Sequence, residues 1–207
     1  MYMYVVLVRA MTGLGKVCRS LGKYEYTHIA VSFEEELKEF VSFSRRKHYA
    51  PFDAGFMREK VEHYAFGPHQ KVRVKVFKIP VTEEAMERIQ AYIKKVEAEE
   101  EYVFNLYAML TMPLLHGFRL YKAHNCMSFV AKLLKLSGVK LAQPYYKYNI
   151  KQMDELLTPY LEGERYLYKK KEDTAYMERV GIFENGKSLL DLNRKLLHRM
   201  FYKNRKR

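Results

Sequence analysis

Cysteine is scarce in this sequence and long apolar runs are missing, and each absence excludes a class of protein. The two cysteines, Cys18 and Cys126, cannot build a disulfide framework, and neither has the Cys-x-x-Cys partner typical of a zinc site. No stretch approaches the roughly 20 consecutive apolar residues of a membrane-spanning helix. The sequence therefore argues against a disulfide-stapled miniprotein and a helical membrane protein.

The first residues, MYMYVVLVRAMTG, carry no basic leader before their apolar run, so we expect a strand there rather than a secretory signal. We accordingly expect a cytoplasmic location with both thiols reduced, although a single disulfide between them stays open. A length of 207 residues with 48% apolar content suits one compact domain.

The net charge of +13 is concentrated at the C-terminus, where residues 193–207 hold seven Lys or Arg and no acid. We expect one domain over residues 1–192 and a basic C-terminal helix or tail over residues 193–207. Helical spacing groups four apolar side chains of this tail on one side, which would dock on the domain or lie on an anionic surface: Leu196, Leu197, Met200 and Phe201.

Hydrophobic periodicity predicts strands first and helices later along the chain, a pattern typical of the α+β class with an antiparallel sheet packed against helices. The predicted strands span residues 2–9, 26–33, 39–44 and 72–79, and residues 45–66 are expected to form a basic, aromatic loop. Helical patterns cover residues 12–21, a segment that starts after Thr82, and residues 102–115, 125–137, 150–157 and 188–202.

Cys126 stands at the start of the amphipathic segment 125–137, which Gly138 terminates. The N–H groups and dipole at a helix N-terminus stabilise a thiolate, and the same groups can donate to an oxyanion. This position favours a nucleophilic role for Cys126. The competing interpretation is a core cysteine, since cysteine is among the most buried residue types.

His28 is the candidate base for this thiol, because it lies in a predicted strand on the face opposite Ile29 and Val31. Ser42 on the next strand is best placed to orient the imidazole, and Ser44 shares its face. A structural role for His28 is the alternative. His124, close to Cys126, is either a further polar group of the site or a loop histidine, and the other histidines have no spacing that suggests a metal site.

The segments YTHIAV, EFVSFS and NCMSFVAKLL resemble the circularly permuted members of the NlpC-type, papain-like cysteine peptidase superfamily, in which the histidine strand precedes the cysteine helix. The resemblance covers residues 2–139. It implies a papain-like α+β fold in which Cys126 is the nucleophile, His28 the base and Ser42 the orienting residue. The third position is often His, Asn, Gln or Glu in this superfamily, and Ser42 departs from that pattern because a hydroxyl carries no charge.

The superfamily includes peptidases, amidases and lipid acyltransferases, so the resemblance implies a reaction class rather than a substrate. We predict a thiol-dependent hydrolase or acyltransferase that acts on an amide or ester bond of a peptide, amide or lipid ester, without a cofactor or a metal. The alternative is a non-catalytic protein that binds an anionic membrane or nucleic acid through its basic tail.

Overall fold

The computed structural model describes residues 1–10 and 24–203. Its main sheet has six strands in the order β4-β3-β2-β1-β5-β8, and every neighbouring pair is antiparallel. The strands are β1 (Tyr2–Val8), β2 (His28–Ser32), β3 (Glu39–Arg45), β4 (Ala54–Lys60), β5 (Lys71–Pro80) and β8 (Leu161–Tyr168). The predicted α+β class with an antiparallel sheet is confirmed.

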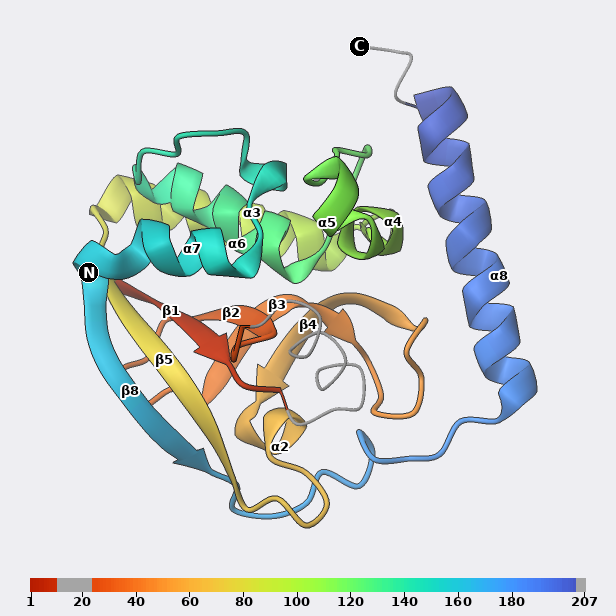
Figure 1. Cartoon of the computed structure of the whole chain (residues 1–207), viewed down its shortest axis with the longest axis horizontal. Helices are drawn as coiled ribbons and strands as arrows, with labels where there is room; N and C mark the ends of the chain where they lie inside the picture. Colours follow the sequence, from red (N-terminus) through yellow and green to blue (C-terminus); the bar gives the residue numbers. More distant parts are fainter. Residues whose placement is uncertain (11–23, 204–207) are drawn as a thin grey trace.

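Helices cover one face of this sheet, and a single helical turn, α2, lies on the other (Figure 1). A separate two-stranded parallel pair, β6 and β7, leads into the helical layer. The remaining elements are α2 (Val61–Tyr64), α3 (Glu83–Ala98), β6 (Val103–Phe104), α4 (Leu106–Leu110), α5 (Met112–Leu115), β7 (Ala123–His124), α6 (Cys126–Ser137), α7 (Ile150–Leu157) and α8 (Ile182–His198), with a π-helical turn at Arg199–Lys203.

Both central helices have capped N-termini, one of them at Thr82 as the sequence predicts. Thr82 accepts a hydrogen bond from the Ala85 N–H at the start of α3. Asn125 closes a capping box with Ser128 at the start of α6, and Gly138 ends that helix in the left-handed conformation with φ 95°. Because these signals are local, the predicted helices over residues 125–137 and 150–157 are confirmed almost to the residue.

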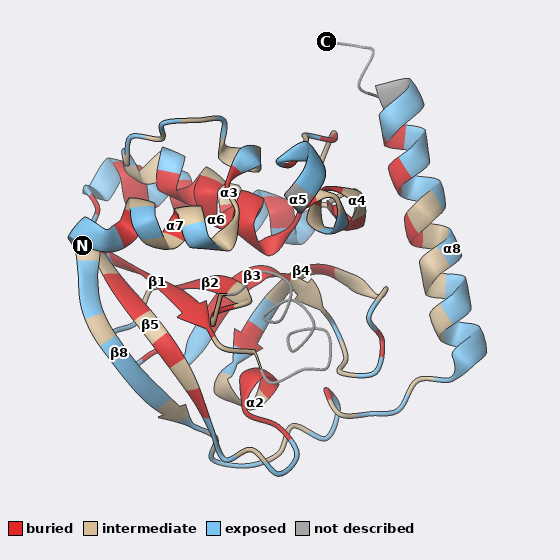
Figure 2. Ribbon diagram, viewed as in Figure 1, coloured by how far each residue is buried: buried red, intermediate tan, exposed pale blue. Residues whose placement is uncertain are grey.

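The sheet is buried on both faces at its centre, and six consecutive residues of β1 are buried (Figure 2). On the helical side Phe129 of α6 is fully buried, with its ring 5.1 Å from Phe43 of β3 and 5.9 Å from Phe56 of β4. Burying a side chain of this size stabilises the fold by about 1.5–3 kcal/mol. This packing holds α6, and with it Cys126, over strands β2 and β3.

Several predictions from the sequence were wrong or incomplete. The expected loop over residues 45–66 contains strand β4 and helix α2, and β8 was not predicted. The expected helix over residues 102–115 is divided into β6, α4 and α5. Both edge strands, β4 and β8, place charged residues at exposed positions, which obscures strand alternation. The helical pattern over residues 12–21 lies outside the described residues.

The last helix, α8, starts at Ile182, so the expected boundary at residue 192 falls inside a helix. Leu192 and Leu196 are buried against the domain, whereas Leu197, Met200 and Phe201 are exposed. The expected single apolar side of the tail is therefore split between two faces. In the part of the chain that the structure describes, no helix combines the length and apolar content needed to cross a bilayer.

Candidate functional site

His28 is the first residue of β2 and pairs with Val8 of β1. The alternation predicted from the sequence is confirmed, because Ile29 and Val31 pack in the core cluster that includes α6 residues while Ala30 belongs to the cluster on the other face. The His28 side chain is only 14% exposed, and its Nε2 lies 3.0 Å from Oε2 of Glu59. A strand backbone and a buried partner thus fix the ring.

Cys126 is the first residue of α6 and carries a buried free thiol. Asn125 Oδ1 accepts from the Ser128 N–H at 2.8 Å, and the Ser128 hydroxyl accepts from the Asn125 N–H at 3.0 Å. This box fixes the turn that carries the thiol. The Cys126 side chain lies near the His28 ring, although the two residues are 98 positions apart in the sequence, and it is among the groups that raise the pKa of His28. Because Nε2 of His28 contacts Glu59, Nδ1 is the ring nitrogen that remains for the thiol.

Glu59 of β4 is the charged partner that sequence reasoning missed. It is buried, and one carboxylate oxygen, Oε2, receives three hydrogen bonds, one of them from the His28 ring. Tyr64 of α2 donates its hydroxyl to that oxygen at 2.9 Å, and Ser42 of β3 donates as well. Several convergent donors favour the ionised carboxylate.

Ser42 therefore lies in the site, but its hydrogen bond goes to Glu59 and not to the imidazole. The hydroxyl expected to orient His28 directly instead contacts the carboxylate, and Ser44 also helps to lower the pKa of that carboxylate. A charged residue occupies the orienting position that Ser42 was expected to fill. The reason lies in the pairing of β3 with β4, which sets Phe40 opposite Glu59 and Ser42 opposite Met57 on one face.

The electrostatics of this cluster favour a charged pair. Burial alone would lower the pKa of His28, but the Glu59 carboxylate and the nearby Cys126 side chain outweigh burial and raise this pKa to about 10. Burial alone would raise the pKa of Glu59, yet the His28 ring and the hydroxyls of Ser42 and Ser44 lower it to about 2. At neutral pH the arrangement is therefore an imidazolium between a carboxylate and a sulfur.

Tyr64 stays a hydrogen-bond donor throughout the accessible pH range. Burial and the neighbouring Glu59 charge raise the pKa of its phenol well above the ordinary value. Its ring also packs against Phe40, with centroids 5.3 Å apart, and against the His28 ring at 5.7 Å. Tyr64 thus binds the carboxylate and packs against the imidazole from the side of the sheet opposite α6.

His124 does not join this cluster, although it precedes Cys126 by two residues. It lies on β7, is buried, and its Nε2 is 2.8 Å from the Tyr92 hydroxyl while its Nδ1 is 3.4 Å from the Ser128 hydroxyl. Burial, with Lys132 and Arg119 nearby, lowers the pKa of His124 to about 3. A neutral His124 supports the capping box of α6 and is not positioned as a base for the thiol.

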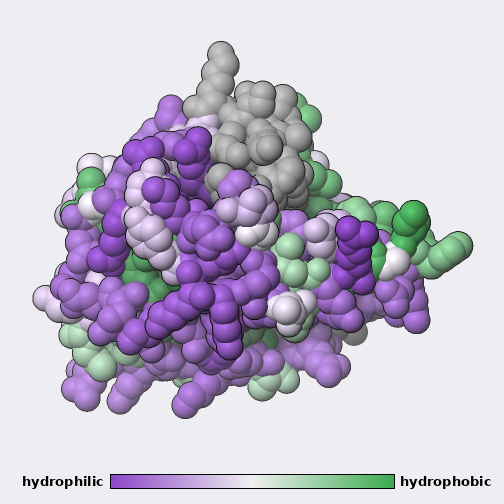
Figure 3. Space-filling view, turned by 90° about the horizontal axis from the view of Figure 1, so that it is seen from below, coloured by the Kyte–Doolittle hydropathy of each residue, from purple (hydrophilic) through white to green (hydrophobic). Residues whose placement is uncertain are grey.

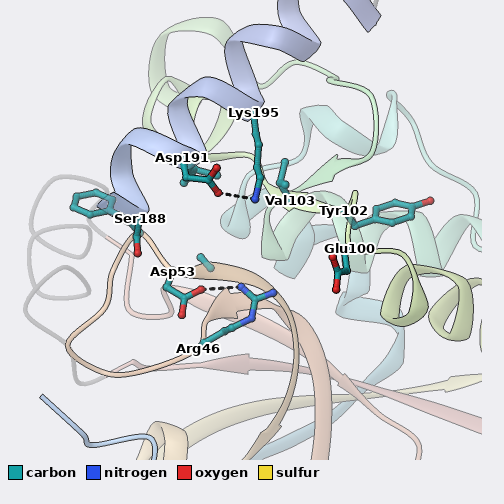
Figure 4. Close-up of a pocket in the computed structure, with 11 residues that line it drawn as sticks. Arg46, Asp53, Glu100, Tyr102, Val103, Ser188, Asp191 and Lys195 are labelled. Carbon is teal, nitrogen blue, oxygen red and sulfur yellow. Dashed lines mark hydrogen bonds and ion pairs between the residues drawn. The ribbon is translucent and has the colours of Figure 1, made fainter. Parts of the chain in front are cut away.

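Among the described residues, no group of three His, Cys, Asp or Glu side chains is arranged to hold a metal ion. A hollow of about 120 Å³ lies between α8 and the domain, lined by charged pairs such as Asp191–Lys195 and Arg46–Asp53 (Figure 4). None of its lining residues belongs to the Cys126 cluster.

One weak signal for Glu59 is present in the sequence. Exposed Arg58 and Lys60 alternate with Met57 and Glu59, which is the period of a strand with one polar face. The three charged residues in a row look like a solvated segment, so the alternation is easily overlooked.

No family model matches the chain, and neither curated proteins nor solved structures provide a match.

Proposed function

We propose that this protein is a thiol-dependent hydrolase or acyltransferase that acts on an amide or ester bond, with Cys126 as nucleophile, His28 as acid and base, and Glu59 as the residue that orients His28. One observation carries the proposal: a cysteine in the first turn of a helix lies near a strand histidine whose Nε2 contacts a buried carboxylate. Acyl transfer requires a nucleophile, a base beside it and an acidic group that orients the base, and the three residues lie next to one another in this order.

The resting state follows from the charges of the cluster. Because the Glu59 carboxylate and the nearby Cys126 side chain raise the pKa of His28 to about 10, the ring is protonated at neutral pH and places a positive charge near the nucleophile. The N–H groups of Cys126 and Met127, in the first turn of α6, have no intrahelical acceptor, and groups of this kind can donate to an oxyanion.

In the first half-reaction the Cys126 thiolate attacks the substrate carbonyl carbon and forms a tetrahedral oxyanion. The C–N or C–O bond then breaks, His28 gives its proton to the leaving amine or alcohol, and a thioester remains on Cys126. In the second half, water or another nucleophile gives a proton to His28 and attacks the thioester. Release of the acid or of the new ester regenerates the thiolate and the imidazolium.

We also propose that the fold is a permuted papain-like one. The support is the order of the parts along the chain: the histidine strand β2 comes first, the acid strand β4 follows, and the cysteine helix α6 comes last and packs on the antiparallel sheet. In this view Glu59 takes the third position, for which the sequence had suggested Ser42, and the charge that a hydroxyl cannot supply is present.

The test is the reactivity of the thiol. In a Cys18→Ser protein Cys126 is the sole thiol, and we expect iodoacetamide to alkylate it rapidly at about pH 6, where an ordinary thiol reacts slowly. A His28→Ala change in the same background should slow this reaction by about tenfold or more, because the imidazolium that stabilises the thiolate is lost. Mass spectrometry of the labelled peptide measures the rate at each pH.

Activity is then sought with p-nitrophenyl esters and anilides of acyl groups of increasing length, which report on acyl transfer without knowledge of the natural substrate. Trapping of a thioester on Cys126, seen as a mass increase, would identify the covalent intermediate. His48→Ala is the matched control, because His48 packs against Phe66 and Tyr176 outside the cluster. The proposal fails if Cys126 reacts at about pH 6 no faster in the parent than in His28→Ala.

A further inference from the structure

The C-terminal helix α8 carries apolar side chains on two opposite faces. Leu192 and Leu196 are buried against the domain. Phe183, Leu190 and Leu197 follow one another at intervals of seven residues, about two helical turns, so they form a line on the side away from the domain. Their exposed fractions are 94%, 72% and 44%.

Basic residues share this outward line. Lys187 follows Phe183 by four residues and Arg194 follows Leu190 by four, which places each on nearly the same side of the helix, and both are exposed. We call the five residues Phe183, Lys187, Leu190, Arg194 and Leu197 the outer face of α8. Fourteen residues separate its ends, which corresponds to about 21 Å along the helix axis.

Polar tethers fix the rotation of α8 and keep this face outward. The Tyr107 hydroxyl of α4 donates to Asn193 Oδ1 at 2.7 Å, and the Asn185 side-chain amide donates to the Tyr49 carbonyl at 3.0 Å. Buried Arg199 donates to the Glu101 carbonyl. The outer face thus has a fixed orientation. The helix α8 lies at the flank of the domain, and its outer face points away from it (Figure 2).

The molecular surface agrees with this arrangement. Seen from below, roughly along the axis of α8, hydrophobic residues stand out at the projecting edge on the side of this helix, whereas most of that view is hydrophilic (Figure 3). Next to the outer face, a hollow of about 270 Å³ is lined by Arg194, Lys195, His198 and Arg199, of which Arg194 and Lys195 pair with Asp191. Residues 182–207 contain eight Lys or Arg and two acids.

We propose that the outer face of α8 docks on an anionic lipid bilayer, parallel to its surface. Apolar side chains mixed with long basic ones suit this position, because Phe and Leu enter the acyl boundary while Lys and Arg extend to the headgroup phosphates. The basic hollow offers a place for one headgroup. Each basic residue near such a surface contributes in the same direction, so the charge of the C-terminal region complements that of the bilayer.

The same residues disfavour a second copy of the chain as the occupant. If two α8 helices packed along this line, Lys187 of each copy would lie within the apolar seam, where an uncompensated charge is costly, whereas Arg194 already pairs with Asp191 of its own helix at 3.1 Å. An anionic surface provides the compensation that a second copy lacks. This inference does not depend on the reaction proposed for Cys126.

The experiment is flotation of the full chain with vesicles of phosphatidylcholine containing about one third phosphatidylglycerol, and with phosphatidylcholine alone. Two double variants test the two parts of the outer face: Phe183→Ser with Leu190→Ser, and Lys187→Gln with Arg194→Gln. The matched control is Leu161→Ser with Tyr166→Ser on β8, where the side chains are 46% and 47% exposed. Thermal melting and Cys126 alkylation of each variant report whether the fold and the thiol site are intact.

We expect binding to the anionic vesicles only, weakened about tenfold or more by each outer-face pair and within about twofold of the parent in the β8 control. Raising the salt concentration should weaken it further. The proposal is overturned if the full chain does not float with anionic vesicles, or if both outer-face variants bind as the parent does. It is equally overturned if the two outer-face double variants bind vesicles as the parent does and lose only a dimer detected by ultracentrifugation, or only a gel shift with RNA.

Discussion

Glu59→Gln is the change that tests the electrostatics of the site most directly, because it removes one charge and keeps the shape of the side chain. Interactions in the folded state lower the pKa of Glu59 from 4.5 to about 2, and the side chain is only 5% exposed. With about 1.4 kcal/mol for each unit of pKa, the ionised carboxylate stabilises the fold by about 3 kcal/mol. Removal of one partner from a buried pair typically costs a similar amount, about 3–5 kcal/mol.

The sign of the pH dependence follows from the two groups. A lowered carboxyl pKa gives stability that is complete above the unfolded value of 4.5 and is lost as pH falls through about 2. The raised pKa of His28 gives stability that is complete below 6.5 and is lost as pH rises through about 10. The cost of Glu59→Gln should therefore be largest between these limits, from pH 4.5 to 6.5.

Urea unfolding followed by circular dichroism measures this cost. The difference in the free energy of unfolding between parent and Glu59→Gln should be about 3 kcal/mol at about pH 5.5, and about 2 kcal/mol smaller at about pH 3. The control is Glu39→Gln on β3, an exposed glutamate 2.8 Å from Arg58, which should cost less than about 1 kcal/mol. A difference for Glu59→Gln that stays constant from about pH 5.5 to pH 3 would refute the charge-based account.

Three further changes test the surroundings of the thiol. Ser42→Ala should lower turnover of a reactive ester by about tenfold, far less than Cys126→Ala, because Ser42 acts only through the carboxylate; equal losses in steady-state assays would contradict this. Asn125→Ala should cost about 1 kcal/mol in urea unfolding, since it opens the capping box of α6, and an unchanged midpoint would argue against the cap. Phe129→Ala should cost about 3–5 kcal/mol in the same assay, because the ring is fully buried under α6; a cost below about 1 kcal/mol would mean that α6 is not anchored there.

The sequence alone determined those features that depend on local periodicity and capping. The alternation around His28 set its face of the sheet, and Asn125 with Ser128 and Gly138 set both ends of the helix that begins at Cys126. Such signals involve residues a few positions apart, so they can be recognised without any knowledge of the fold. The pairing of a strand histidine with a helix-start cysteine followed from these local features.

The tertiary structure alone decided which side chains meet. Glu59 contacts His28 across two intervening strand pairings, and its burial arises from the register of β3 with β4 and from Tyr64 of α2, which no local pattern encodes. In the same way, spacing showed that the last helix has apolar residues, but only its docking decided that Leu196 is covered and Leu197 is exposed. Burial depends on contacts between segments distant in sequence, and these contacts set both the charge of His28 and the outer face of α8.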